Sequence, residues 1–197
     1  MKCKAVFLDR DGTINTEKNY LHKIEEFHLI PGVMDALKLL SQNKILIYII
    51  TNQSGIARGF YTEKDFHQLT SHMIQFLSQE NIAIQDVLYC PHHPDATLEA
   101  YKQNCECRKP ANGLLKKIMK EKKLQSADVA LVGDKNSDID AGKSLGLKTY
   151  LVETGHGKTE KLATKADFVV PSLLEAVHHL LHSWNYDLPS LTTGACQ

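Results

Sequence analysis

Short apolar runs alternate along this chain with segments whose apolar residues recur at helical spacing, and this alternation constrains the fold most. Short apolar runs are typical of buried strands, and spacing of three and four residues is typical of a helix with one buried face. The predicted strands cover residues 6–8, 45–50, 86–89, 129–132, 149–152 and 168–170. The predicted helices cover residues 33–40, 63–79, 114–123 and 137–145, with a last one from Pro171 to His182. This order predicts a three-layer α/β domain with a mostly parallel central sheet.

The helix over 63–79 has a clear start, because Thr62 and Asp65 have the spacing of a capping box with Asp in place of Glu. Two long segments, 15–30 and 90–112, show neither the helical nor the strand spacing of apolar residues and are predicted to be loops. Long loops inside a compact domain are usually functional. The apolar face of the helix is predicted to consist of Phe66, Leu69, Met73, Phe76 and Leu77.

Length and composition limit the class of protein. The 197 residues suit one domain over 1–184, followed by a flexible tail over 185–197. The 23 basic and 23 acidic side chains balance, which argues against a nucleic-acid partner. No apolar run reaches the roughly 18 residues of a membrane span, and residues 1–5 lack the apolar segment of a signal peptide. A cytoplasmic monomer with no membrane partner is the expectation.

Two carboxylates, Asp9 and Asp11, stand where the first apolar run ends at a glycine. In open α/β sheets ligands bind at the carboxyl edge of the strands, so both side chains are expected at a binding edge. Two carboxylates this close stay ionised only if a cation lies between them, or else one takes a proton. Both outcomes suit catalysis. The alternative interpretation is ordinary turn chemistry, with Asp9 capping a turn.

Three later segments place polar residues at the same predicted edge: Thr51-Asn52, Arg108-Lys109 and Asp134 with Asp138. This mixture of carboxylates, donors and cations suits phosphoryl transfer. Asp9 is the candidate nucleophile and Asp11 the candidate general acid and base. Mg²⁺ is predicted to be held by Asp9, Asp134 and the backbone carbonyl of Asp11. Donors to the phosphoryl oxygens are expected from Thr51, Asn52 and Lys109, and Arg108 offers a planar fork for a second polar or anionic group.

Each of these residues also has a structural explanation when taken alone. Asp134 after Gly133 could cap a helix, Lys109 before Pro110 could be merely exposed, and Thr51 could be a turn residue. Their joint occurrence at successive strand ends favours the catalytic interpretation.

Two cysteine-containing pairs lie in the loop over residues 90–107. Cys90-x-His92 and Cys105-x-Cys107 supply four ligands, and alternate residues of an extended segment project to one side. A Cys₃His set matches structural Zn²⁺, which is tetrahedral and leaves no open position. His93 is the competing imidazole. The ion is expected to fix the loop that carries Arg108, so its removal should reduce activity through this loop and not through the chemical step.

The motifs together resemble the haloacid-dehalogenase (HAD) superfamily of phosphatases. The resemblance rests on Asp9-Arg10-Asp11-Gly12-Thr13, Thr51, Lys109 and Gly133-Asp134 with Asp138, in that order. Their spacing fits a member with small loop insertions and no large cap domain. The runs over 9–15, 51–59, 90–94 and 105–110 resemble more closely the branch that acts on heptose bisphosphates. The resemblance implies a Rossmann-like fold, Mg²⁺ dependence and loss of the 7-phosphate during ADP-heptose synthesis.

The same resemblance implies contacts with a sugar bisphosphate substrate. The matching positions are Asp9, Arg10, Asp11, Glu17, Lys18, Asn19, Tyr20, Thr51, Asn52, Gln53, Ser54, Arg108, Lys109 and Lys135. Two other interpretations stay open. A histidinol-phosphate phosphatase shares the catalytic motifs and a similar zinc loop, although the 55–59 run and the long spacer between the metal pairs favour the heptose branch. A non-catalytic, zinc-stabilised phosphate-binding module would have no need to keep all four catalytic positions.

Overall fold

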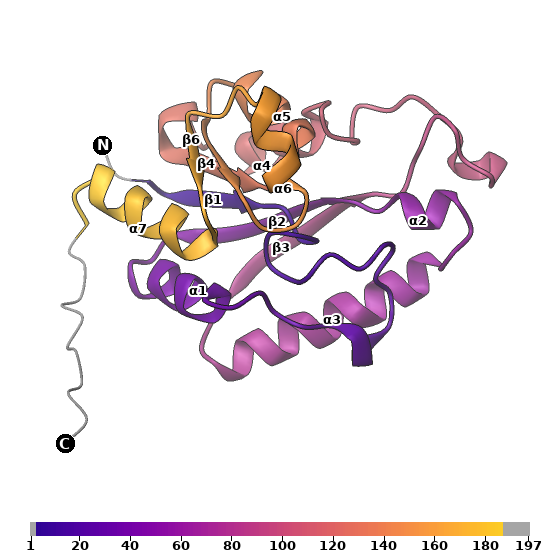
Figure 1. Ribbon diagram of the computed structural model, residues 1–197, viewed down its shortest axis with the longest axis horizontal. Helices are drawn as coiled ribbons and strands as arrows, with labels where there is room; N and C mark the ends of the chain where they lie inside the picture. The colour runs from indigo at the N-terminus through magenta and orange to yellow at the C-terminus, as the bar shows by residue number, and fades with distance from the viewer. Residues whose placement is uncertain (1–2, 187–197) are drawn as a thin grey trace.

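The computed structural model describes residues 3–186, which form a six-stranded sheet between two layers of helices (Figure 1). The strands run in the order β3-β2-β1-β4-β5-β6, and every neighbouring pair is parallel. Their bounds are Ala5–Leu8 (β1), Leu46–Asn52 (β2), Ile84–Cys90 (β3), Val129–Gly133 (β4), Lys148–Val152 (β5) and Phe168–Val170 (β6). The predicted three-layer α/β fold is confirmed.

The helices begin and end near the predicted limits. They are Val33–Gln42 (α1), Ser54–Ala57 (α2), Glu63–Gln79 (α3), Gly113–Glu121 (α4), Asn136–Lys143 (α5), Gly157–Glu160 (α6) and Leu173–Ser183 (α7). Helix α3 has the predicted limits and the predicted capping box, in which the amide of Asp65 donates to the Thr62 hydroxyl and the amide of Thr62 to the Asp65 carboxylate. The short helices α2 and α6 were not predicted, because four residues are too few to show a period. The predicted loops contain only the single 3₁₀ turns Ile24–Glu26 and Glu99–Tyr101.

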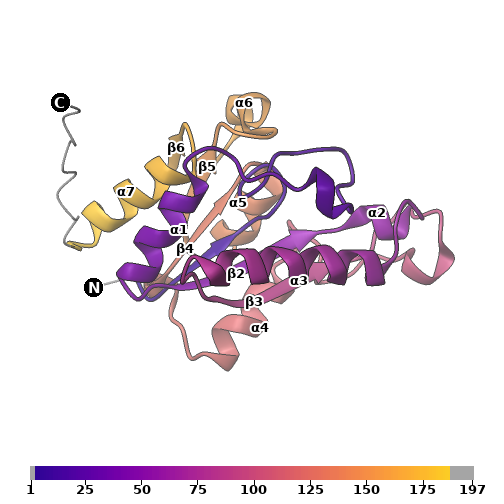
Figure 2. The same ribbon diagram turned by 90° about the horizontal axis from the view of Figure 1, so that it is seen from below.

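Alternate side chains of β1 pack into two separate hydrophobic cores, one on each face of the sheet. Val6 and Leu8 pack with α1, α3 and α7, whereas Ala5 and Phe7 pack with α4 and α5. All four side chains are fully buried, as expected for the central strand of a parallel sheet. In Figure 1 α1 and α3 lie below the strands and α4 and α5 above them, and Figure 2 shows α1 and α3 from below with α7 beside α1.

Two details differ from the sequence prediction. Phe76 was expected on the buried face of α3 and is 39% exposed, because it lies at the edge of the helical stripe that the four buried positions form. The folded part also extends two residues past the predicted boundary at 184, since the Tyr186 hydroxyl donates to the Cys3 carbonyl at 2.6 Å. The predicted flexible tail otherwise falls on residues 187–197, with Cys196, which lie outside the described residues. No helix within 3–186 is long and apolar enough to span a bilayer.

Candidate active site

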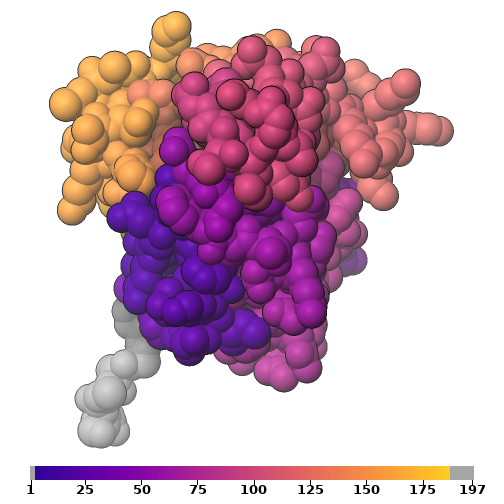
Figure 3. Space-filling view, turned by 90° about the vertical axis from the view of Figure 1, so that its right-hand side faces the viewer, coloured from indigo at the N-terminus to yellow at the C-terminus, as the bar shows by residue number. Residues whose placement is uncertain are grey.

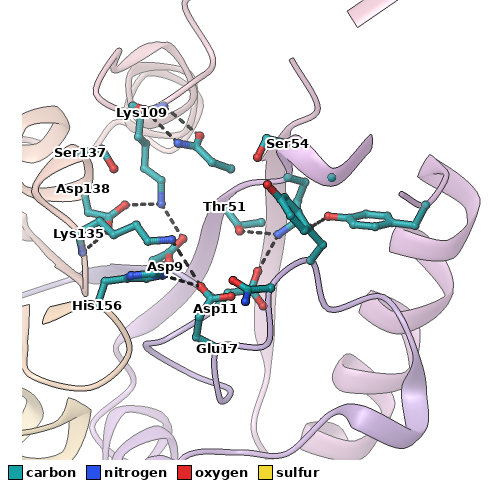
Figure 4. Close-up of a pocket in the computed structure, with 16 residues that line it drawn as sticks. Asp9, Asp11, Glu17, Thr51, Ser54, Lys109, Lys135, Ser137, Asp138 and His156 are labelled. Carbon is teal, nitrogen blue, oxygen red and sulfur yellow. Dashed lines mark hydrogen bonds and ion pairs between the residues drawn. The ribbon is translucent and has the colours of Figure 1, made fainter. Parts of the chain in front are cut away.

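A cavity of about 260 Å³ opens at the carboxyl edge of the sheet, where the ends of β1, β2 and β4 meet (Figure 4). Figure 3 looks at this end of the molecule, and chain segments from the first third (indigo), the middle (magenta) and the last third (orange) come together on it. The predicted site residues that line the cavity are Asp9, Asp11, Glu17, Asn19, Tyr20, Thr51, Asn52, Gln53, Ser54, Lys109 and Lys135.

A buried lysine links two carboxylates of the candidate site. The Nζ of Lys109 lies 2.7 Å from Asp9 Oδ1 and 2.6 Å from Asp138 Oδ1, and it also donates to the carbonyl of Ile50 at 2.5 Å. Burial alone would lower the Lys109 pKa, but the two carboxylates outweigh it and the pKa is raised, so the ammonium stays charged. Asn52 fixes the Lys109 backbone through two hydrogen bonds of 3.0 Å. This explains how a residue far along the chain reaches the end of β1.

Three carboxylates converge where the sequence placed a magnesium ion. Ligand oxygens of Asp9, Asp134 and Asp138 lie within 4.8 Å of one another, and all three residues are buried. Burial, followed by repulsion from Asp9 and Asp138, raises the pKa of Asp134 to about 8. Oδ1 of Asp134 is buried without a hydrogen-bond partner among the described residues. Crowded negative charge with a free oxygen is the environment that a hard divalent cation stabilises, so these residues fit Mg²⁺.

Close approach of backbone to Asp134 requires glycine at two positions. A Cβ on Gly12 would lie 2.3 Å from Asp134 Oδ2, and a Cβ on Gly155 would lie equally close to the same atom. Both glycines have positive φ, +85° and +53°, which favours residues without a side chain. The amide of His156 then donates to Asp134 Oδ2 at 2.8 Å. The loops after β1 and β5 therefore hold one oxygen of Asp134.

Asp11 is held by donors on three side chains. Arg10 approaches its carboxylate with Nε and Nη2 at 2.8–3.1 Å, and Asn15 and Gln53 each donate at 2.9 Å. Burial by itself would raise the Asp11 pKa, but the Arg10 charge and these hydrogen bonds outweigh burial, so the pKa is lowered. Arg10 is itself 1% exposed, with its guanidinium 5.5 Å from the centre of the Phe66 ring. Arg10 therefore lies behind Asp11, and it does not line the cavity as the predicted substrate contact would.

Gln53 connects Asp11 to the end of β2. Its Nε2 donates to Asp11 Oδ2 at 2.9 Å and to the Thr51 hydroxyl at 2.8 Å. Its Oε1 accepts from the Tyr61 hydroxyl at 2.5 Å, which fixes the orientation of the amide. Tyr61 also lines the cavity, and sequence reasoning missed it because it lies outside every motif.

The rim of the cavity carries residues of both charges. Glu17 Oε2 lies 3.5 Å from Lys135 Nζ and 3.5 Å from His156 Nε2. Ser137 and His156 line the cavity and were not predicted. The sequence held one signal for a loop that turns back toward the site: Gly155 stands directly before His156, shortly after the predicted strand over 149–152.

The predicted zinc ligands come together as expected. Cys107 Sγ lies 3.0 Å from Cys90 Sγ, 3.2 Å from Cys105 Sγ and 3.2 Å from His92 Nδ1. All four ligand atoms lie within 4.8 Å of one another, which suits a small tetrahedral ion. The competing His93 is elsewhere, with its Nδ1 accepting from the amide of Asp95. This cluster could hold a metal ion.

Two further predicted substrate contacts, besides Arg10, do not line the cavity. Arg108 donates from Nη1 to the carbonyl of His92 at 3.3 Å, so its fork faces the cysteine loop. Lys18 is exposed and is not part of the lining. The sequence could not show where these side chains point, so their contact with the substrate stays a prediction.

Comparison with known proteins agrees with the geometry. The HAD-hydrolase-like family model matches residues 106–176. A D-glycero-beta-D-manno-heptose-1,7-bisphosphate 7-phosphatase of Haemophilus ducreyi is 42% identical over 179 residues, 90% of this chain and 98% of that protein. The alpha-specific counterpart from Photorhabdus laumondii is 44% identical over 160 residues, 81% of this chain and 87% of that protein. The crystal structure of D,D-heptose 1,7-bisphosphate phosphatase from B. bronchiseptica, complexed with magnesium and phosphate, has a TM-score of 0.82 at 29% identity and covers 93% of this chain and 99% of that one.

The buried Asp9–Lys109–Asp138 set on a parallel sheet makes this chain a phosphatase of the HAD superfamily. Within that superfamily it belongs to the heptose-1,7-bisphosphate 7-phosphatases, as identities above 40% over most of both chains require.

Proposed function

We propose that this protein hydrolyses the 7-phosphate of D-glycero-D-manno-heptose 1,7-bisphosphate and so acts in ADP-heptose synthesis. The observation that carries the proposal is the buried Asp9, paired with Lys109 beside Asp134 and Asp138, in a chain 42% identical to a named 7-phosphatase. Mg²⁺ held by Asp9 and Asp134 would supply positive charge that offsets the repulsion between these carboxylates and the phosphate. The backbone carbonyl of Asp11 remains the further ligand that we propose.

Asp9 is the nucleophile in this scheme. Lys109 holds Oδ1, which leaves Oδ2 to attack phosphorus. Burial raises the Asp9 pKa to about 6, against the opposing charge of Lys109, so most of the carboxyl is ionised at neutral pH. A bond forms between Oδ2 and phosphorus while the bond from phosphorus to the sugar oxygen breaks, which gives an aspartyl phosphate and an alkoxide. Thr51 and Asn52 lie at the cavity wall and are placed to donate to phosphoryl oxygens.

Asp11 moves the proton in both halves of the reaction. The Arg10 clamp keeps it ionised before substrate binds. A phosphate dianion entering beside it adds like charge, which raises its proton affinity. Asp11 then takes a proton from solvent and gives it to the alkoxide, and the carboxylate that results takes a proton from the water that attacks the aspartyl phosphate. Phosphate leaves, and Asp9 is regenerated.

Phosphate release from α- and β-heptose 1,7-bisphosphate, beside histidinol phosphate, tests this proposal. We expect Mg²⁺-dependent turnover of at least one heptose anomer with kcat/KM at least tenfold above that of histidinol phosphate. Preference for histidinol phosphate would assign the protein to the rival branch. Asp9→Asn should abolish turnover while leaving the fold intact, and phosphate release at the wild-type rate from this variant would refute the nucleophile. Binding of phosphate without turnover by the wild-type protein would support the non-catalytic module.

We also propose that Cys90, His92, Cys105 and Cys107 hold one structural Zn²⁺. The mutual distances of the four ligand atoms support it. Four protein ligands leave no open position, which separates this ion from the chemistry. Metal analysis of the purified protein should give one zinc per chain.

The location and the assembly state stay as predicted from the sequence. The free thiols of the cluster suit a reducing compartment, which supports the cytoplasm. A monomer of 22.1 kDa is the expected mass in light scattering, and a dimer mass would contradict it.

A further inference from the structure

Glu17 is an unusual side chain for a cavity that receives phosphate. A carboxylate accepts hydrogen bonds and donates none when ionised, and it repels a phosphate dianion. Two cationic or donor groups face it: Lys135 Nζ and His156 Nε2 both lie 3.5 Å from Oε2 (Figure 4). The carboxylate has no third partner among residues 3–186. Oε1 is therefore left to accept from a ligand.

The position of His156 is set by its backbone. Its amide donates to Asp134 Oδ2 at 2.8 Å, and the Thr154 hydroxyl donates to the Gly12 carbonyl at 2.6 Å. The loop over 154–156 is thus docked on the segment that carries the catalytic carboxylates. The imidazole, 47% exposed, projects from this fixed point to the rim, where it meets Glu17.

We propose that His156 is a positioning residue, which together with Lys135 orients Glu17 to accept hydrogen bonds from the hydroxyl groups of the sugar. The proposal deepens the assigned reaction and rests on it, since a heptose chain carries hydroxyl groups next to the reacting phosphate. The Lys135 ammonium also offsets the charge of Glu17, which lowers its repulsion of the phosphate. The rim thereby distinguishes a polyhydroxylated phosphate ester from a phosphate ester without hydroxyl groups.

Glu17 and His156, together with Asp134, could instead form a second metal site, but the contacts argue against it. Ligand atoms of Glu17, Asp134 and His156 lie within 4.8 Å of one another, close enough to surround a second metal ion. However, the Lys135 ammonium already lies 3.5 Å from the Glu17 oxygen that would ligate it. A second cation there would be repelled by a fixed positive charge.

The test compares two substrates on six proteins. The substrates are heptose 1,7-bisphosphate and p-nitrophenyl phosphate, which has a phosphate and no hydroxyl group. Three of the proteins are the wild type, His156→Ala, which keeps the backbone hydrogen bond to Asp134, and His156→Lys, which restores a hydrogen-bond donor. The others are Glu17→Gln, the double variant Glu17→Gln with His156→Ala, and His182→Gln as a control on the exposed face of α7. Near-ultraviolet circular dichroism checks that each variant is folded.

We expect His156→Ala to raise KM for the heptose substrate about tenfold with kcat changed less than threefold, the effect of one weakened charge-assisted hydrogen bond. The loss in kcat/KM for the heptose substrate should exceed that for p-nitrophenyl phosphate at least fivefold. His156→Lys should return KM for the heptose substrate most of the way to the wild-type value, and His182→Gln should have the wild-type kinetic constants. Combining His156→Ala with Glu17→Gln should be no worse than Glu17→Gln alone.

Three results would overturn the inference: equal losses on both substrates, unchanged KM for the heptose substrate, or additive losses in the double variant. A Mg²⁺ or Mn²⁺ requirement that changes from two ions to one in His156→Ala would instead establish the second metal site and overturn it too. Failure of the assigned reaction is a separate outcome, because the wild type would then hydrolyse p-nitrophenyl phosphate but neither heptose anomer.

Discussion

Replacing Asp134 by asparagine should stabilise the magnesium-free protein while abolishing its activity. The side chain is fully buried beside Asp9 and Asp138, and Lys109 pairs with those two and not with Asp134. Asparagine has nearly the same shape, and its oxygen can still accept from the His156 amide. The substitution therefore removes the cost of holding a carboxyl at this position, which must either carry a crowded charge or take up a proton on folding, and keeps the packing.

The magnitude follows from the pKa of the carboxyl. Folding raises the Asp134 pKa from 3.8 to about 8, chiefly by burial and then by the neighbouring carboxylates. An acid whose folded pKa is raised contributes full stability below its unfolded pKa and loses it as pH rises towards the folded pKa, at roughly 1.4 kcal/mol per pH unit. By pH 7 the loss is at most about 4 kcal/mol, and relaxation of the site reduces it to roughly 2 kcal/mol.

Urea unfolding at pH 7 and pH 4 in magnesium-free buffer, with zinc retained, measures this. Asp134→Asn should be more stable than the wild type by about 2 kcal/mol at pH 7 and by little at pH 4, where both are neutral at this position. Added Mg²⁺ should stabilise the wild type and have a smaller effect on the variant. A variant that is less stable at pH 7, or equally stabilised at both pH values, would refute the argument that crowded charge destabilises this site.

Two further predictions concern the cysteine loop and its support. Cys105→Ser should lower the zinc content below one per chain and raise KM at least fivefold. The value of kcat should fall less than threefold, because Asn52 still holds the Lys109 backbone by two hydrogen bonds. Zinc-free protein with an unchanged KM would contradict this prediction. Glu63→Gln should cost roughly 1 kcal/mol of unfolding free energy at pH 7, because hydrogen bonds from the Tyr89 and Tyr101 hydroxyls hold the Glu63 pKa below its usual 4.5. Urea unfolding of both proteins should show the full difference in unfolding free energy above pH 4.5, and the difference should shrink as pH falls through the lowered pKa of Glu63. A difference that grows at low pH would exclude an ionised Glu63 as the acceptor.

Local patterns in the sequence were sufficient for the fold and for the chemical core of the site. Strand and helix periods depend on neighbours a few residues away, so α3 was placed to the residue and the strands to within about two. Because parallel strands share one carboxyl edge, the strand ends at Asp9 and Asp134 had to meet. The Cys₃His spacing likewise limited the ligands to one set, with His92 chosen over His93.

Only the tertiary structure decided where the side chains at that edge point. Arg10 turns inward behind Asp11, Arg108 turns to the cysteine loop, and Asp138 joins the carboxylate cluster through Lys109. His156 and Tyr61 reach the cavity from loops with no motif. These directions depend on contacts between separate segments of the chain, 16 residues apart for Arg108 with His92 and 43 for Arg10 with Gln53, which no local period encodes. The sequence determined which chemistry gathers at the sheet edge, and packing between distant loops decided which groups face the substrate.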